Sequence, residues 1–175
     1  MSITGALKNS GYVPEKSTAG DKPILVGVYK ALFVDWKVQE DKGYGPSIRA
    51  DFKVSEKLSG YDSRSTFPEF VGFFNTSDEK VNSKKNGLAK LLNGFFSVGL
   101  KVDTSTDDTL YASLDSHKGS AEVYIKGYKK NPRKQVDGAW VDNPDGDVKQ
   151  DFTFMTQKNA EKEAAKEIKK AGHPL

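Results

Sequence analysis

The segment 120–156 constrains the fold most, because it predicts two long strands joined by a wide polar loop. In its first part, Ala121, Val123 and Ile125 alternate with polar and aromatic residues, and alternate residues of a strand point to opposite faces. Its last part, 148–155, is also rich in β-forming residues. Between them, 131–147 carries two prolines and two glycines, which favour turns. We therefore expect a hairpin with one core face and one face of mixed tyrosine and lysine.

Cations and aromatic rings gather in this hairpin. Its cations, with no carboxylate between the first and the last, are Lys126, Lys129, Lys130, Arg133 and Lys134, and the aromatic residues near them are Tyr124, Tyr128 and Trp140. Lysines alone often serve to keep an exposed strand edge from aggregating. Lysines interleaved with flat rings are typical of a surface that holds phosphates and stacks bases, so we predict nucleic-acid binding here.

Length and composition indicate one soluble domain. A chain of 175 residues is large enough to bury a stable core without disulfides or a bound metal. The absence of cysteine excludes disulfides, thiolate metal sites and cysteine nucleophiles. The first 20 residues have no apolar signal segment, and no apolar run approaches the roughly 18–20 residues that a membrane span needs. We expect a cytoplasmic location and no membrane contact.

The rest of the chain predicts a mainly β, α+β architecture. We expect a flexible N-terminal arm at 1–22, a binding domain at 23–156, and a C-terminal helix and tail at 157–175. Strands are expected at 24–38, with a bulge near Gly27 or Lys30, and at 47–55 and 66–74. Apolar residues at helical spacing then predict a helix, namely Leu88, Leu91, Leu92, Phe95 and Phe96. A short second helix is expected within 104–115. The C-terminal helix has mostly alanine as its apolar residues, so we expect it to be solvated and dispensable.

The order predicted for this chain is three strands, a helix and a final hairpin. An oligonucleotide-binding (OB) barrel has the same order, since it is a partly open five-stranded Greek-key sheet with a helix between strands three and four. The residues also resemble the small single-stranded-DNA-binding proteins of bacteriophages. The similar stretches are 27–31 (GVYKA), 67–70 (FPEF) leading into the helix at 84–96, and 124–130 (YIKGYKK) with 150–152 (QDF). That resemblance implies an OB barrel that coats single strands during phage replication or recombination, in the host cytoplasm. Such proteins often end in an acidic tail, whereas this chain ends in a mixed-charge helix.

The predicted binding residues come from several strands. Arg49 and Lys53 share the polar side of the second strand, which lies across the binding face of an OB barrel. The complete predicted set is Lys30, Tyr44, Arg49, Lys53, Tyr124, Lys126, Tyr128, Lys129, Lys130, Arg133, Lys134 and Trp140. Tyr124 and Tyr128 are expected to stack on successive bases. Tyr29, Phe33, Phe73 and Phe74 could also stack on bases, but an aromatic residue in a barrel strand is more often part of the core, so we expect each of them to pack there.

Catalysis has few candidate residues. The chain has two histidines, His117 in a polar segment and His173 near the end. It therefore offers almost no candidate residues for a catalytic triad or a multi-histidine metal site. Clustered aspartates beside asparagine, proline and glycine are typical of turns rather than of Mg²⁺ sites. Gly43-Tyr44-Gly45 lacks the lysine and hydroxyl residue of a phosphate loop. We expect no enzyme activity, no metal and no cofactor.

The functional prediction is sequence-independent binding of single-stranded DNA. The sequence does not separate DNA from RNA, and it leaves open self-association and contacts with replication or recombination proteins. Two alternatives also stay open: a structural or interaction protein, such as a virion β-domain whose hairpin pairs with another subunit, and an accessory domain that binds a protein.

Overall fold

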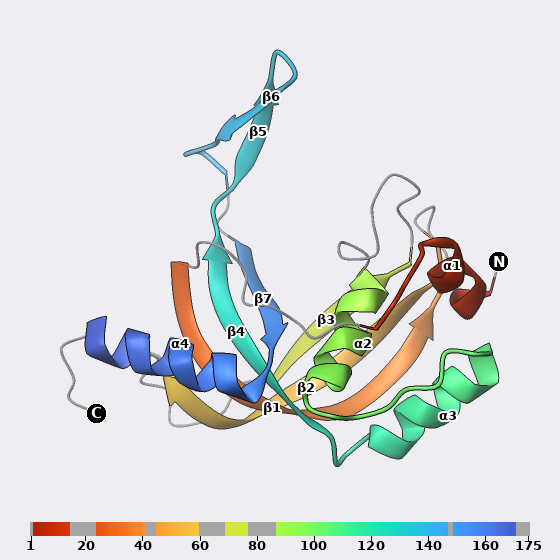
Figure 1. The fold of residues 1–175 in the computed structure, drawn as a ribbon. Coiled ribbons are helices and arrows are strands. Elements are labelled where there is room, and N and C mark those ends of the chain that lie inside the picture. Colours follow the sequence, from red (N-terminus) through yellow and green to blue (C-terminus); the bar gives the residue numbers. More distant parts are fainter. Residues whose placement is uncertain are drawn as a thin grey trace.

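The computed structural model describes residues 2–14, 24–40, 45–59, 69–76, 87–146 and 149–170. A five-stranded antiparallel sheet is combined with helices and a separate hairpin (Figure 1), which confirms the mainly β, α+β class. The main-sheet strands are β1 (Ile24–Gln39), β2 (Ser47–Ser59), β3 (Glu69–Asn75), β4 (Glu122–Lys130) and β7 (Lys149–Met155), and the hairpin consists of β5 (Arg133–Val136) and β6 (Ala139–Asp142). The helices are α1 (Ile3–Asn9), α2 (Gly87–Ser97), α3 (Asp107–His117) and α4 (Gln157–Lys170).

The sheet order is β3-β2-β1-β4-β7, with the long β1 in the centre. The N-terminal half of β1 pairs with β4, and β2 pairs along most of its length. The predicted bulge is confirmed, because the register shifts between Leu25 and Gly27 and again between Lys30 and Ala31. Gly27 has φ of 141°, and a side chain there would strike the backbone of Ser59. These bulges bend β1 strongly.

The bend brings the two outermost strands close together. The Phe74 ring of β3 lies 6.3 Å from the ring of Phe152 and 6.0 Å from that of Phe154, both on β7 (ring centroids). Within the described residues, β3 and β7 are not paired through their backbones. The sheet is therefore curled with aromatic rings at its seam, and its described strands do not close into a barrel.

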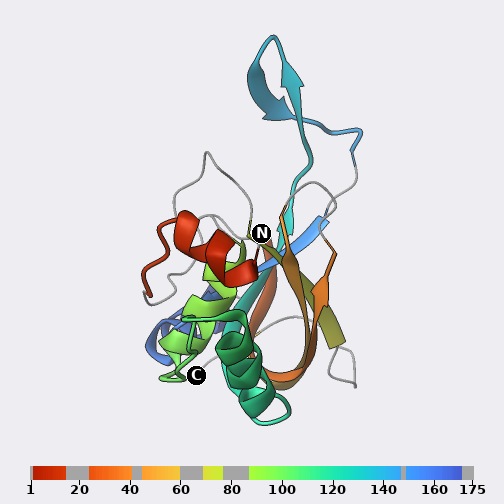
Figure 2. The same cartoon turned by 90° about the vertical axis from the view of Figure 1, so that its right-hand side faces the viewer.

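The main core lies between this curled sheet and α2. The predicted helix is confirmed, because Leu88, Leu91, Leu92 and Phe95 are all buried, whereas Phe96 is exposed. Phe95 meets Phe33 of β1 edge to face with ring centroids 5.2 Å apart. Gly94 is the point of closest approach, since a side chain there would collide with Phe154. Figure 2 shows α1, α2 and α3 gathered on one side of the sheet.

Within the predicted flexible arm at 1–22, the expectation is wrong for α1 at Ile3–Asn9. Ile3 and Leu7 of α1 are buried in the main core. The Asp107 carboxylate at the start of α3 accepts hydrogen bonds from the backbone N–H groups of Ile3 and Thr4. The predicted second helix is confirmed as α3, which Thr106 caps and which buries Leu110 and Leu114. Together α1 and α3 extend the core beyond the sheet.

The C-terminal helix forms as predicted but is not a solvated appendage. Ala160 and Ala164 of α4 are buried against Val28 of β1 and Met155 of β7, in a second small core. Alanine buries little area, yet its small side chain lets the helix backbone approach the strands closely. The expectation of a solvated helix is therefore wrong, whereas its dispensability for the fold stays a prediction.

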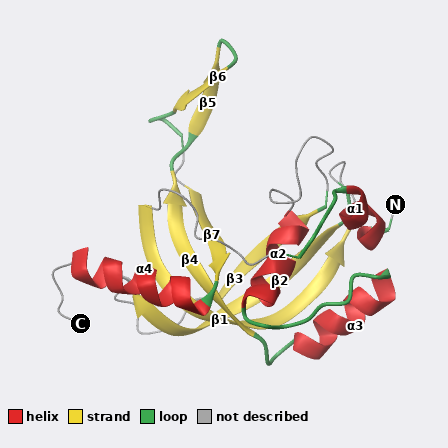
Figure 3. Ribbon diagram, in the orientation of Figure 1, coloured by secondary structure: helices red, strands yellow, loops and turns green. Residues whose placement is uncertain are grey.

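The predicted long loop between β4 and β7 contains a hairpin of its own. Asp137 and Gly138 both have positive φ, 50° and 81°, as a two-residue type I′ turn requires. β5 and β6 pair only with each other among the described strands. Figure 3 shows this hairpin extending away from the body of the protein, beyond the ends of β4 and β7.

Candidate nucleic-acid interface

β4 alternates as predicted, but its second face is covered. Val123 and Ile125 are buried in the main core. Tyr124 is half-buried and packs beside the small core that α4 forms with the sheet. Since α4 contacts β1, β2 and β4, it lies over the face on which we expected bases to stack. Tyr124 is therefore not openly accessible.

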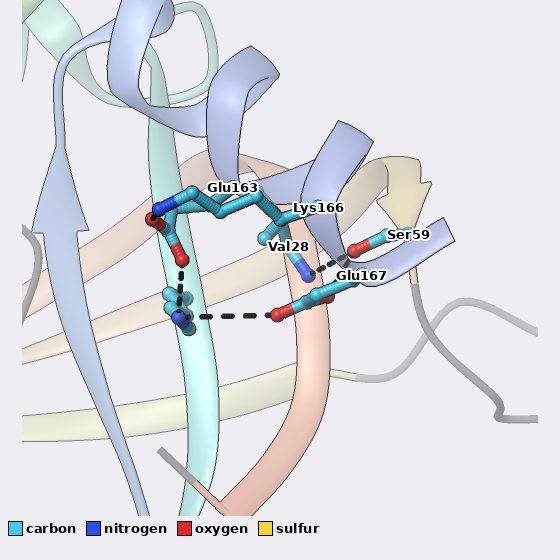
Figure 4. A network of polar contacts seen from close by, with 6 residues as sticks. Val28, Ser59, Glu163, Lys166 and Glu167 are labelled. Carbon is cyan, nitrogen blue, oxygen red and sulfur yellow. Dashed lines mark hydrogen bonds and ion pairs between the residues drawn. The ribbon is translucent and has the colours of Figure 1, made fainter. Parts of the chain in front are cut away.

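Lys126 belongs to a buried ion-pair network rather than to a phosphate site. Figure 4 labels the other members of this network, which are Val28, Ser59, Glu163, Lys166 and Glu167. Only 4% of the residue is exposed. Its Nζ donates to Glu163 Oε2 at 2.7 Å and lies 3.9 Å from Glu167 Oε1. The Ser59 hydroxyl donates to Glu167 and accepts from the N–H of Val28 at 3.3 Å. The predicted phosphate contact is wrong for Lys126, because its ammonium group is already held by carboxylates of α4.

The two glutamates of this network have pKa values shifted in opposite directions. Burial raises the pKa of Glu167 above its ordinary value. The hydrogen bond from Lys126 lowers the pKa of Glu163, and the ammonium group of Lys166, at 3.2 Å, acts in the same direction. The network thus holds one carboxylate that favours its ionised form and one that favours its protonated form.

The two pKa shifts make the stability of the protein depend on pH in opposite directions. The raised pKa of Glu167 gives a contribution that is full below the ordinary pKa and is lost as the pH rises through the raised value. The lowered pKa of Glu163 gives a contribution that is full above the ordinary pKa and is lost as the pH falls through the lowered value. At neutral pH, Glu167→Gln is therefore expected to raise the free energy of unfolding, and Glu163→Gln is expected to lower it.

Denaturant unfolding of both variants measures these differences. Both should shrink in acid, where the two glutamates of the natural protein are protonated. If Glu167→Gln destabilised the protein at neutral pH as much as Glu163→Gln does, the charge assignment of the network would be wrong.

Lys30 and Tyr128 also lie near the covered end of the sheet. Lys30 Nζ is 3.0 Å from Glu122 Oε2 and 5.9 Å from the centre of the Tyr124 ring. Tyr128 is half-buried, and its burial, together with the nearby Asp151 carboxylate, raises the pKa of its phenol. Both side chains are therefore engaged within the protein.

Among the remaining predicted cations of this segment, only Arg133 and Lys134 have side chains in the described part. Lys129 and Lys130 end β4, where they pair with Gln150 and Lys149, but their side chains lie outside the described part, as does the whole of Tyr44. Arg133, Lys134 and Trp140 are exposed on the hairpin. Lys126 is buried, so it does not contribute to a basic surface on this segment.

An open surface lies instead on the outer face of β2 and β3. The strand register places Arg49 of β2 between Lys37 of β1 and Phe73 of β3. Phe73 is 61% exposed. Arg49 Nε forms an ion pair with Asp51 Oδ1 at 2.9 Å. Lys53, two positions further along β2, is exposed. This set, Lys37, Arg49, Lys53, Val71 and Phe73, is called the β2–β3 face below.

Phe73 corrects the sequence analysis, which expected it in the core. Phe74 is the core residue, only 6% exposed, and Phe73 points the other way. The signal was present in the alternation of β3, where Phe73 shares its side with the polar residues Glu69 and Asn75. Arg49 and Lys53 lie on the outer face, as their alternation predicts.

Comparison with known proteins adds no family assignment. No protein-family model matches this sequence, and no curated protein matches it.

The described residues contain no group of three or more His, Asp or Glu side chains arranged to hold a metal ion. No helix in the described ranges is long and apolar enough to cross a membrane.

Proposed function

We propose that this protein binds single-stranded DNA without sequence preference, on an OB-like fold, and coats single strands during phage replication or recombination. The strand order β3-β2-β1-β4-β7 supports the OB-like part, since α2 falls between the third strand and β4. The seam of phenylalanines between β3 and β7 is consistent with a partly open barrel. The binding surface in this proposal is the β2–β3 face.

One observation carries the proposal: an exposed phenylalanine lies in register beside an arginine on an uncovered sheet face. Phe73 and Val71 lie two residues apart on the same side of β3 and are 61% and 40% exposed, and contiguous exposed apolar surface is a feature of binding sites. Every base has a flat face that can stack on such a ring, so stacking is tolerant of sequence. Lys37 and Arg49 lie on neighbouring strands in the same row, where they can reach the phosphates that flank a stacked base. In OB folds the second and third strands form this binding surface.

The charges of the β2–β3 face predict a modest dependence on salt. Its three cations, Lys37, Arg49 and Lys53, stand beside three carboxylates, Asp35, Asp51 and Glu69. Binding should therefore depend more on stacking than on phosphate neutralisation. It should also favour single strands over duplex, whose bases are stacked on one another.

Salt titration of a Lys53→Ala variant tests the electrostatic part. Each phosphate contact on a single strand contributes a slope of roughly −0.7 to the plot of log affinity against log salt. Lys53→Ala should make this slope shallower by about one such contact. The control is Lys162→Ala, which removes an equal charge from the exposed side of α4 and should leave the slope unchanged. Equal slopes for the natural protein and both variants would remove Lys53 from the interface.

A competition between oligothymidine, mixed-sequence single strands and duplex of equal length tests the proposal as a whole. Similar affinity for the two single strands and much weaker affinity for duplex is the expected result. Equal affinity for single strands and duplex would mean that charge alone binds, and no binding to any of them would reject the function.

A further inference from the structure

The β5–β6 hairpin forms a two-stranded sheet of its own and is not paired with the main sheet in the described part of the chain. All eight of its strand residues are exposed. They include three large apolar side chains, Val136, Trp140 and Val141, with Trp140 61% exposed. An isolated two-stranded hairpin is at best marginally stable in water, and three or more strands are needed for independent stability. The views in Figures 1 and 2 agree that it projects away from the body.

The two free edges of this hairpin differ in charge. β5 carries Arg133 and Lys134 side by side, and adjacent cations are a common protection of an open strand edge. β6 reads Ala139, Trp140, Val141 and Asp142, so its charge is confined to one end. The β6 edge therefore lacks the usual protection against pairing with another strand.

We propose that the β6 edge pairs with the β6 edge of a second copy of this chain. Antiparallel pairing about a two-fold axis at Val141 would place Val141 opposite Val141 and Trp140 opposite Asp142 of the second copy. No like charges then face each other. Two marginal hairpins become one four-stranded sheet, and the contact is closed and self-complementary, as in most homodimers.

The hydrogen bonds within the hairpin leave this edge usable. Arg133 Nη2 donates to the carbonyl oxygen of Trp140 at 2.7 Å. A backbone carbonyl has two lone pairs and accepts a second hydrogen bond. Asp142 is 91% exposed and lies 4.0 Å from Arg133 Nε, so it is free to adjust to a partner strand.

A second copy fits the hairpin better than nucleic acid does. Between Arg133 and Asp142 there are two cations and two carboxylates, Asp137 and Asp142, so the hairpin has no net charge. A polyanion gains little from such a surface. The β6 edge is apolar with a single terminal charge. Pairing with an identical strand would stabilise it, because that strand supplies both backbone hydrogen-bond partners and apolar contacts.

The pairing is expected to be weak in the free protein. Four-residue strands bury much less than the roughly 1,600 Å² of a standard stable interface. Copies held next to one another on a single strand would associate more readily, because their effective concentration is raised. The pairing itself does not depend on the proposed DNA binding.

Sedimentation velocity of the full chain without nucleic acid, over a wide range of protein concentration, tests the proposal. The natural protein should show a concentration-dependent monomer–dimer equilibrium. Val141→Lys should weaken it by roughly tenfold or more, because it places like charges directly opposite each other. The matched control is Gln135→Lys, which adds the same charge to β5 and should leave the dimer intact. Val141 and Gln135 are both exposed, so neither substitution should unfold the domain, and thermal unfolding checks this.

Three results would overturn the proposal. They are a monomer at every concentration, a dimer that Val141→Lys does not weaken, and equal weakening by Val141→Lys and Gln135→Lys. Because no nucleic acid is present, none of these results bears on the binding of single-stranded DNA.

Discussion

Replacing Lys126 with alanine is expected to lower the free energy of unfolding by about 3–5 kcal/mol, because it leaves the carboxylates of a buried ion pair without their cation. Glu163 and Glu167 point at Lys126 from α4, and their side chains are only 20% and 10% exposed. The loss should be large compared with the roughly 5–15 kcal/mol total stability of a domain. Chemical denaturation at neutral pH measures it.

The control for this substitution is Lys162→Ala on the exposed side of α4, for which an effect within about 0.5 kcal/mol is expected. The Lys126→Ala loss should become smaller in acid, where protonation of the two glutamates removes the unpaired charges. A Lys126→Ala protein as stable as the Lys162→Ala protein would show that α4 does not close over this face of the sheet.

Replacing Phe73 with alanine is expected to weaken the binding of oligothymidine by about 1–3 kcal/mol, which is roughly 5- to 150-fold. The ring is largely exposed, so thermal stability should change little. Fluorescence anisotropy of a labelled oligonucleotide gives the affinity, and the same samples give the melting temperature.

Two neighbours on β3 serve as controls for Phe73. Val71→Ala shortens an exposed apolar side chain on the same face without removing a ring, and it should reduce affinity much less. Phe74→Ala removes a core ring and should cost about 3–5 kcal/mol of stability. If Phe73→Ala and Val71→Ala bound equally well, stacking on Phe73 would be excluded.

Local patterns predicted most of the elements. Alternation along β2 and β4 identified which residues face the core, and helical spacing identified Leu88, Leu91 and Leu92 as the stripe of α2. These patterns are carried by neighbouring residues, so they are visible without knowledge of the fold. The seam between β3 and β7 was not predictable in this way, because it joins rings that lie far apart in the sequence.

The candidate site was predicted less well than the fold. Lysine in a strand normally faces solvent, and Lys126 does not because Glu163, 37 residues later, supplies its partner. The alanines of α4 suggest little burial, yet their small size lets the helix cover Tyr124. Phe73 was assigned to the core because most strand phenylalanines are there. For Lys126 and for α4, a contact between distant segments decided the outcome, whereas for Phe73 the alternation of β3 already carried the signal.

Photocrosslinking of a bromodeoxyuridine-substituted single strand, followed by identification of the crosslinked residues, tests the central claim most directly. Our account predicts crosslinks at Phe73 and its neighbours on β3, lost on competition with unlabelled oligothymidine and retained in the presence of duplex. Crosslinks confined to the β4 face that α4 covers, around Tyr124, would contradict the account. So would a complete absence of competable crosslinks.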